Sequence, residues 1–381
     1  MNKPVPPPPL PFIDLASQRH RMGAAVEEAI LRVVRHGAYI LGPEVTELET
    51  ALAEFCGAKH VVTCSDGTDA LALVLMAKGV KPGDAVLCPS FTYTATAEVV
   101  ARLGATPVFA DVEDWYFGLD VESLGGALAT ARQRGLSPVG VISVDLFGHP
   151  ADYDALAPFC EANGLWLLGD AAQSLGGRYG GKPLGTFGFA TTTSFFPAKP
   201  LGCYGDGGAI FTDDPALDAQ LRSLRFHGLS PDRSDHTAIG LTGRLDTIQA
   251  AVLLEKLKIF PDEIAERNAV ADRYAEGLSD VATVPMVAEN CVSVWAQYTI
   301  RVAPERRAAM AAALKERGIP TAIYYSKPVH RLAAYRDFPC AGNGLPVTDR
   351  LSQEVISLPM HPYLDPATQD RIIEAARAAL A

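Results

Sequence analysis

The segment HVVTCSDGTDALALVLMAKG, residues 60–79, carries the pattern that decides the fold. It begins with a β-type run, and apolar residues at helical spacing follow from Ala70 to Lys78. The same alternation of short β-type runs and helical runs continues through 85–87, 95–102, 106–110, 121–132, 139–144, 152–162 and 166–168. Such alternation predicts an α/β fold with a mostly parallel sheet between helices. Ligands of these sheets bind beyond the carboxyl ends of the strands.

The chain on either side of this alternation is expected to be mainly helical at first. The predicted helices cover 18–35, 44–55, 216–225 and 247–277. A C-terminal α+β module follows, with predicted strands at 292–302 and 321–323 and predicted helices at 304–317 and 366–380. Because Phe260-Pro261 interrupts the long helical run, we predict a large domain over 1–260 and a small domain over 261–381.

Composition and charge restrict the class of protein. Of 381 residues, 48% are hydrophobic and 20% are charged, as in ordinary globular proteins. The net charge of −11 argues against nucleic acid or an anionic membrane as a partner, because those surfaces need clustered Lys and Arg. The opening MNKPVPPPPLP is a proline-rich, extended arm without the apolar core of a signal peptide. The seven cysteines form no CxxC pair, so we expect reduced, mostly buried thiols in a cytoplasmic protein with no metal site.

The segment TTTSFFPAKPLGCYGDGGA, residues 191–209, contains the residue with the clearest chemical potential. Lys199 lies between two prolines and directly after two phenylalanines. Partial desolvation there would lower the pKa of its amine and prepare it for Schiff-base chemistry with a carbonyl. The alternative is a surface lysine on a Gly/Pro loop, since lysines are rarely buried.

Two further candidates follow predicted strands. Gly67, in SDGTDAL (65–71), opens a helix where free N–H groups and the helix dipole favour an anion. Ordinary capping by Ser65 or Asp66 explains the same residues equally well. Asp170 ends the apolar run 165–168, where sites are built, or it caps the turn that begins at Ala171.

Two more segments carry weaker signals. Tyr93, in PSFTYT (89–94), can stack on a planar ring, although aromatics at such positions more often pack in the core. Arg244, in GLTGRLD (240–246), can bind a phosphate or carboxylate through two N–H groups, or it can form a surface ion pair.

The segment GGRYGGK, residues 176–182, fits the spacing of a phosphate-binding NTPase loop. The next residue is Pro183, where such a loop needs a hydroxyl for magnesium, and no strand leads directly into the segment. The glycines instead predict a β-turn connection.

Taken together, these segments resemble the DegT/DnrJ/EryC1/StrS family of sugar aminotransferases, which have the type I pyridoxal-phosphate fold. The resemblance spans nearly the whole chain. It is carried by motifs in the family's order: FIDL (12–15), YILGPE (39–44), GTDAL (67–71), DAAQ (170–173), SFFPAK (194–199), GDGGA (205–209), RLD (244–246), QAA (249–251) and LPMHP (358–362).

The resemblance implies a role for each matched residue. Lys199 would carry pyridoxal phosphate covalently, Asp170 would pair with the pyridine nitrogen, and Gln173 would hydrogen-bond the ring 3-oxygen. Tyr93 would stack on the ring, and Gly67, Thr68 and Ser194 would hold the phosphate. Relatives that dehydrate sugars carry His at the lysine position, so Lys199 argues for amino transfer.

The resemblance also implies a homodimer with shared active sites. The segment Thr242–Arg244 would reach into the neighbouring subunit, where Arg244 would bind the cofactor phosphate or a substrate anion. The family usually has Asn where this chain has Thr242, which offers a single hydroxyl for the contact.

Glutamate is the implied amino donor, and a nucleotide-linked keto-sugar is the implied acceptor. The closest subfamily pattern is that of enzymes that aminate C3 of UDP-linked 3-keto-N-acetylhexosaminuronic acids for lipopolysaccharide. The candidate substrate contacts are Arg244, His227, Tyr324, Tyr325, Lys327, His330 and Arg331. Two alternatives remain: a pyridoxal-phosphate enzyme for another keto-sugar position or a small amine or keto acid, and a non-catalytic binding or regulatory protein.

Overall fold

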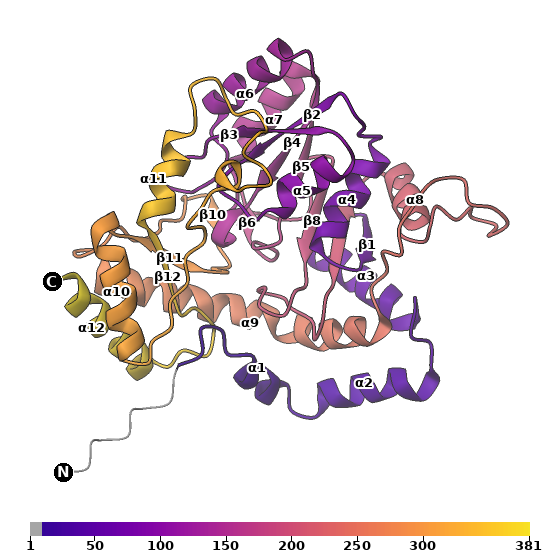
Figure 1. Cartoon of the computed structure of the whole chain (residues 1–381). Helices are drawn as coiled ribbons and strands as arrows, with labels where there is room; N and C mark the ends of the chain where they lie inside the picture. Colours follow the sequence, from indigo (N-terminus) through magenta and orange to yellow (C-terminus); the bar gives the residue numbers. More distant parts are fainter. Residues whose placement is uncertain (1–9) are drawn as a thin grey trace.

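The computed structural model describes residues 10–381, so positions 1–9 of the predicted proline-rich arm lie outside it. Its centre is a seven-stranded sheet in the order β1-β9-β8-β5-β4-β2-β3 (Figure 1). The strands are β1 (His60–Cys64), β2 (Asp84–Pro89), β3 (Thr106–Ala110), β4 (Ser137–Val144), β5 (Trp166–Asp170), β8 (Ala190–Ser194) and β9 (Gly208–Thr212). Only β9 runs antiparallel to its neighbours. The prediction of a mostly parallel sheet is therefore confirmed.

Helices cover both faces of this sheet. Their bounds are α3 (Pro43–Cys56), α4 (Gly67–Ala77), α5 (Ala95–Arg102), α6 (Val121–Gln133), α7 (Tyr153–Asn163), α8 (Pro215–Leu224) and α9 (Thr247–Leu278). Alternate residues of β1 face opposite ways: Val62 packs in the core with α4, whereas Val61 packs in the core with α3 and α9. This two-sided burial is what the continuous apolar strands predict.

A second apolar core lies at the C-terminal end of α9, beside α10 (Pro304–Glu316) and α12 (Pro366–Leu380) (Figure 1). It includes the ladder of β11 (Tyr298–Arg301) with β12 (Val355–Leu358), and α11 (Pro346–Glu354) leads into β12. The predicted strand 321–323 is reduced to one isolated bridge, between Ala322 and Ser357. No helix within residues 10–381 is long and apolar enough to cross a membrane.

Pro261 does not interrupt the long helix, contrary to the sequence-based expectation. Helix α9 continues through it for 32 residues. A proline inside a helix costs about 3 kcal/mol because one hydrogen bond is lost. Burial on both sides offsets this cost: Phe260 packs in the core under the large sheet, and Tyr274 packs in the C-terminal core. The boundary near residue 260 stays a prediction.

Two other predicted elements are divided. The helix expected at 18–35 is split into α1 (Leu15–Met22) and α2 (Ala25–His36), because the backbone turns at Gly23 with φ of 58°. The strand expected at 292–302 is split into β10 (Cys291–Val292) and β11, and Trp295 between them has φ of 49°. In that gap the chain wraps around Phe147 and Gly148, whose carbonyl groups accept from Gln297 and Val294 N–H groups at 3.4 and 3.2 Å.

The segment GRYGGKP forms a short hairpin of β6 (Arg178–Tyr179) and β7 (Lys182–Pro183). This confirms the predicted turn connection. All seven cysteines are free thiols, of which five are buried, as expected.

His361 in the LPMHP motif predicts a loss of stability in acid. It is 3% exposed, and neither ring nitrogen has a hydrogen-bond partner among the described residues. Burial lowers the pKa of His361 to about 4, with Arg267 acting in the same direction and Asp14 against it. The unfolded chain binds this proton below pH ~6.5 and the folded chain does not, so folding free energy of roughly 3 kcal/mol is lost as the pH falls from about 6.5 to about 4.

We expect His361→Asn to flatten the fall of the urea unfolding midpoint between pH 7 and pH 4.5. His20→Gln removes an exposed histidine and is the matched control. An unchanged pH slope in His361→Asn would contradict this account of the buried imidazole.

Candidate active site

The first turn of α4 and the end of β8 form a close contact. A Cβ atom added to Gly67 would lie 2.7 Å from Cβ of Ser194, so only glycine fits at this position. Asp66 caps the helix by accepting from Asp69 N at 2.8 Å, which confirms the capping interpretation for that residue. The backbone of Gly67 and Thr68 and the hydroxyl of Ser194 are thus gathered at a helix N-terminus, an arrangement that fits a phosphate group.

Asp170 and Lys199 lie close enough to influence each other's ionisation. Asp170, at the end of β5, is buried, and its Oδ1 accepts from Ala172 N at 3.0 Å, so it also caps the following turn. Burial raises the pKa of Asp170, and the charge of Lys199 opposes this shift. Burial lowers the pKa of Lys199, and Asp170 opposes that shift. Lys199 is half-buried, so the predicted partial desolvation is present, and the lysine is not an exposed surface residue.

Gln173 is held in one orientation. Its Oε1 accepts from Phe147 N at 2.8 Å. A backbone N–H can only donate, so the amide NH₂ group is left to donate elsewhere. Tyr325 lies close to Gln173: burial raises the pKa of the Tyr325 hydroxyl, and the Gln173 side chain opposes the shift.

Tyr93 is 60% exposed, whereas the neighbouring Phe91 is fully buried. The core-packing alternative therefore applies to Phe91. Tyr324 and Tyr325 pack on the aromatic cluster around Phe91, with ring centroids of Phe91 and Tyr325 6.3 Å apart. The exposed ring of Tyr93 remains free to cover a planar ligand.

Thr242, Arg244 and His227 form a second group, on the connection between α8 and α9. Thr242 Oγ1 is 2.8 Å from Nε2 of His227, and the Arg244 guanidinium lies 4.7 Å from the ring centroid of Phe226. The surface-ion-pair alternative for Arg244 is thus replaced by stacking on an aromatic ring. Within one chain this group packs beside α4, where Gly243 approaches Leu73.

His330 is already engaged. Its backbone N–H donates to Ser90 Oγ at 3.0 Å, and its Nδ1 lies 2.6 Å from the same hydroxyl. The hydroxyl therefore donates to Nδ1, and Nε2, 3.3 Å from Asp349, carries the remaining proton. Arg331 is also bound to Asp349, at 2.6 Å. His330 thus fixes its own loop through Ser90, and the side chains of His330 and Arg331 are both engaged by Asp349.

Asp145 and Phe147 lie beside these residues, although no sequence motif singled them out. Asp145 follows β4 as directly as Asp170 ends β5, so the rule that sites form at the carboxyl ends of strands could have found it. Phe147 gave no signal, because its contact to Gln173 uses a backbone N–H group.

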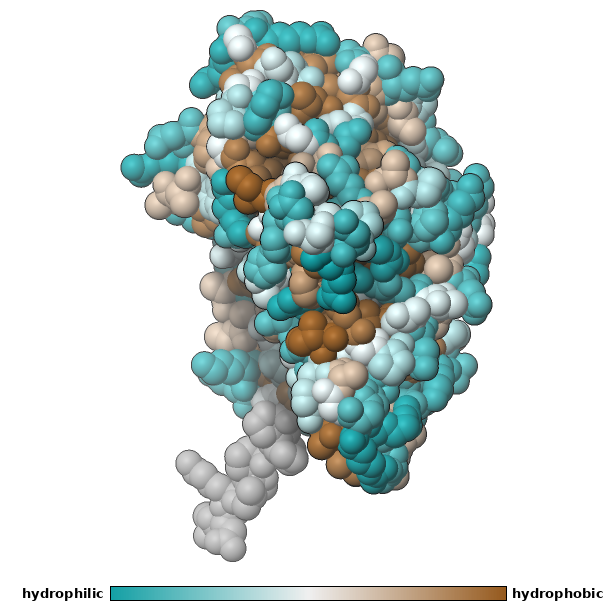
Figure 2. Space-filling view, turned by 90° about the vertical axis from the view of Figure 1, so that its right-hand side faces the viewer, coloured by the Kyte–Doolittle hydropathy of each residue, from teal (hydrophilic) through white to brown (hydrophobic). Residues whose placement is uncertain are grey.

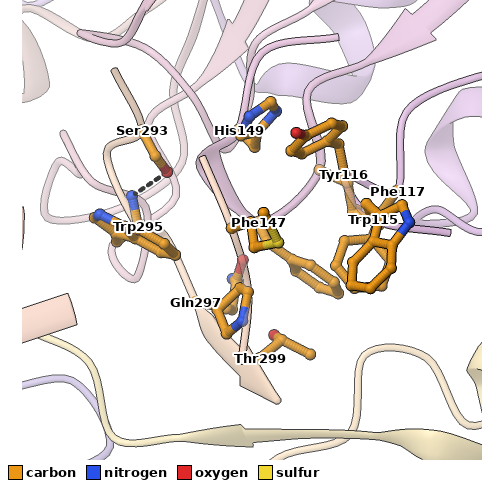
Figure 3. A pocket seen from close by; sticks show the side chains of 12 residues that line it. Trp115, Tyr116, Phe117, Phe147, His149, Ser293, Trp295, Gln297 and Thr299 are labelled. Atoms are coloured by element: carbon orange, nitrogen blue, oxygen red, sulfur yellow. Dashed lines mark hydrogen bonds between the residues drawn. The ribbon is translucent and has the colours of Figure 1, made fainter. Parts of the chain in front are cut away.

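A narrow cavity lies beside Phe147, between the loop 112–119 and the segment 285–299 (Figure 3). Aromatic side chains and His149 line it, and its free volume is about 10 Å³. That volume holds about one water molecule, so this cavity is not the substrate site.

Comparison with known proteins identifies the family of the chain. A model of the DegT/DnrJ/EryC1/StrS aminotransferase family matches residues 20–377. The UDP-2-acetamido-2-deoxy-3-oxo-D-glucuronate aminotransferase of Pseudomonas aeruginosa is 47% identical over 94% of this chain and 96% of its own length.

Two solved structures are also similar. A DegT/DnrJ/EryC1/StrS aminotransferase from Brucella abortus superimposes with a TM-score of 0.96 at 49% identity, over 98% of this chain and all of its own. NtdA from Bacillus subtilis, with bound cofactor PMP, has a TM-score of 0.88 at 25% identity, over all of this chain and 87% of its own. The chain therefore belongs to the DegT/DnrJ/EryC1/StrS aminotransferase family and is an enzyme that uses pyridoxal phosphate.

Proposed function

We propose that this enzyme transfers the amino group of glutamate to C3 of a UDP-linked 3-keto-N-acetylhexosaminuronic acid, giving an amino-sugar for a cell-surface polysaccharide. The observation that supports the chemistry is the closeness of Asp170 and Lys199, because the charge of each opposes the pKa shift that burial causes in the other. The sugar class rests on the 47% identity to the 3-oxo-glucuronate aminotransferase, which extends over 94% of the chain.

The site residues would divide the work. Bound pyridoxal phosphate supplies a ring that takes up the charge left when a proton leaves the donor's α-carbon. Lys199 Nζ, with its lowered pKa, moves that proton, because a neutral amine can accept it. Asp170 would accept from the ring nitrogen, and Gln173 would donate to the 3-oxygen. Gly67, Thr68 and Ser194 would hold the phosphate, and Tyr93 would cover the ring.

A panel of acceptors tests the substrate class. The enzyme is loaded with cofactor and converted by glutamate to the amino form, and each acceptor is scored by recovery of the visible absorption band. We expect the UDP-linked 3-keto-sugar with a C6 carboxylate to react fastest. The analogue without the carboxylate should be at least about tenfold slower, the effect of one lost charge-assisted contact. Equal rates with simple 2-oxo acids other than 2-oxoglutarate would overturn the proposal.

We further propose that the active unit is a homodimer in which Thr242, Arg244 and His227 complete the partner's site. Large apolar side chains are exposed along α2, the loop after it and the 228–240 connection: Leu31, Val34, Tyr39, Ile40 and Ile239 are 40, 48, 48, 47 and 91% exposed. Figure 2, which views the molecule from the α8 side, shows hydrophobic patches within a hydrophilic surface on that face. Patches of this kind mark association surfaces.

A further inference from the structure

Asp145 is a buried carboxylate without an assigned role. It lies directly after β4 and is fully buried. Its Oδ1 accepts from Ala151 N and from the Tyr153 hydroxyl, both at 2.9 Å, and its Oδ2 accepts from the Ser174 hydroxyl at 2.7 Å. All three partners donate, so the ionised carboxylate is the form that they fit.

These bonds close the loop 145–153 and join it to the DAAQS turn. Ser174 directly follows Gln173, and the backbone N–H of Asp145 donates to the Asp170 carbonyl at 3.1 Å. Two residues beyond Asp145, Phe147 donates its N–H to Gln173 Oε1. Asp145 thus holds both ends of the contact that orients Gln173: the loop that supplies the donor and the turn that supplies the amide.

Aromatic packing keeps Phe147 in this position. Its ring meets Phe117 edge to face, with centroids 5.0 Å apart, and it lies beside the narrow cavity (Figure 3). Its backbone has φ of 60°, which is rare for a non-glycine residue and requires support from its surroundings. Asp145 supplies that support on one side, and the chain segment with Trp295 supplies it on the other through the hydrogen bonds to Phe147 and Gly148.

We propose that Asp145 is a positioning residue of the transamination site, which fixes the amide of Gln173 so that its NH₂ group faces the 3-oxygen of the cofactor. This inference rests on the proposed role of Gln173. Asp145 acts through the loop 145–153 and through Ser174, and it contacts neither cofactor nor substrate. Burial raises the pKa of Asp145 to about 7, and the charge of Asp170 acts in the same direction, whereas its three hydrogen-bond donors oppose the shift.

The pH midpoint of the visible absorption change of the cofactor-loaded enzyme tests the proposal. A donor to the 3-oxygen stabilises its negative charge, so loss of the donor makes this oxygen more basic and strengthens its hold on the proton shared with Lys199. Gln173→Ala should therefore raise the midpoint by about one unit, the size of one hydrogen bond to a charged oxygen. Asp145→Asn should raise it in the same direction by at least about half as much.

Three further variants sharpen the result. The double variant Asp145→Asn/Gln173→Ala should shift the midpoint no further than Gln173→Ala alone, because both changes remove one contact. Ser174→Ala deletes a single donor, keeps every charge and should give a smaller shift, and it serves where Asp145→Asn does not fold. Asp152→Asn also replaces a carboxylate by an amide in the same loop and should leave the midpoint unchanged. Asp152 lies at the start of α7, where it accepts from Ala155 N and the Tyr179 hydroxyl and makes no hydrogen bond to the DAAQS turn.

The outcomes distinguish the positioning role of Asp145 from the proposed role of Gln173. If Gln173→Ala shifts the midpoint while Asp145→Asn and Ser174→Ala do not, or if the double variant adds the two shifts, the positioning role is wrong and the proposed function stands. If Gln173→Ala itself causes no shift, the role of Gln173 and the inference built on it both fail.

Discussion

Replacement of Lys199 by alanine is expected to lower the rate of amino transfer by roughly 10⁴-fold, because it removes both the covalent anchor and the base that moves the proton. The structure is consistent with the role as base: burial lowers the pKa of Lys199, while Asp170 opposes the shift. The measurement is the decay of the visible absorption band after glutamate is mixed with enzyme loaded with cofactor.

Lys182→Ala is the matched control. Lys182 is exposed and lies in the hairpin of β6 and β7, in the segment 176–182 that fits the spacing of an NTPase loop. It should retain the wild-type rate. If Lys199→Ala completes many turnovers with glutamate at the wild-type rate, the assignment of the catalytic lysine is wrong.

A mixture of the two impaired variants Arg244→Ala and Lys199→Ala is expected to recover about a quarter of the wild-type activity, if the sites are shared across a twofold dimer. Arg244→Ala alone should lose about 10- to 100-fold, because one charge-assisted contact to an anion disappears. In a mixed dimer with Lys199→Ala, one site has neither residue and the other has both. Half of the dimers in an equal mixture are mixed, and each contributes one of two sites.

The mixing experiment needs subunit exchange, which sedimentation of differently tagged subunits can follow. Arg233→Ala offers a matched control, since its guanidinium lies 5.7 Å from the same Phe226 ring that Arg244 covers at 4.7 Å. A mixture of Arg233→Ala and Lys199→Ala should show only the activity that its Arg233→Ala subunits have by themselves, with no gain on mixing. Mixed Arg244→Ala and Lys199→Ala subunits without any recovery would contradict the shared site.

Patterns of a few residues were enough to predict the parallel sheet and the chemistry of the site. The alternation that begins at HVVTC predicts parallel strands, and Lys199 and Asp170 stand beside strand ends where a ligand binds. Local patterns misjudged the elements whose course depends on distant contacts. Helix α9 passes through Pro261 because two separate cores hold its two halves, and the strand expected at 292–302 opens to wrap around Phe147 and Gly148.

The sequence by itself therefore determined the α/β architecture and the family and predicted the lysine–aspartate pair, since periodicity and motif order are local properties of the chain. Only the tertiary structure decided which polar atoms are already engaged. It ties His330 to Ser90 across 240 positions, orients Gln173 through the backbone of Phe147, and surrounds the buried carboxylate of Asp145 with three donors. Hydrogen bonds of this kind depend on distance and direction in space, and no spacing along the chain encodes them.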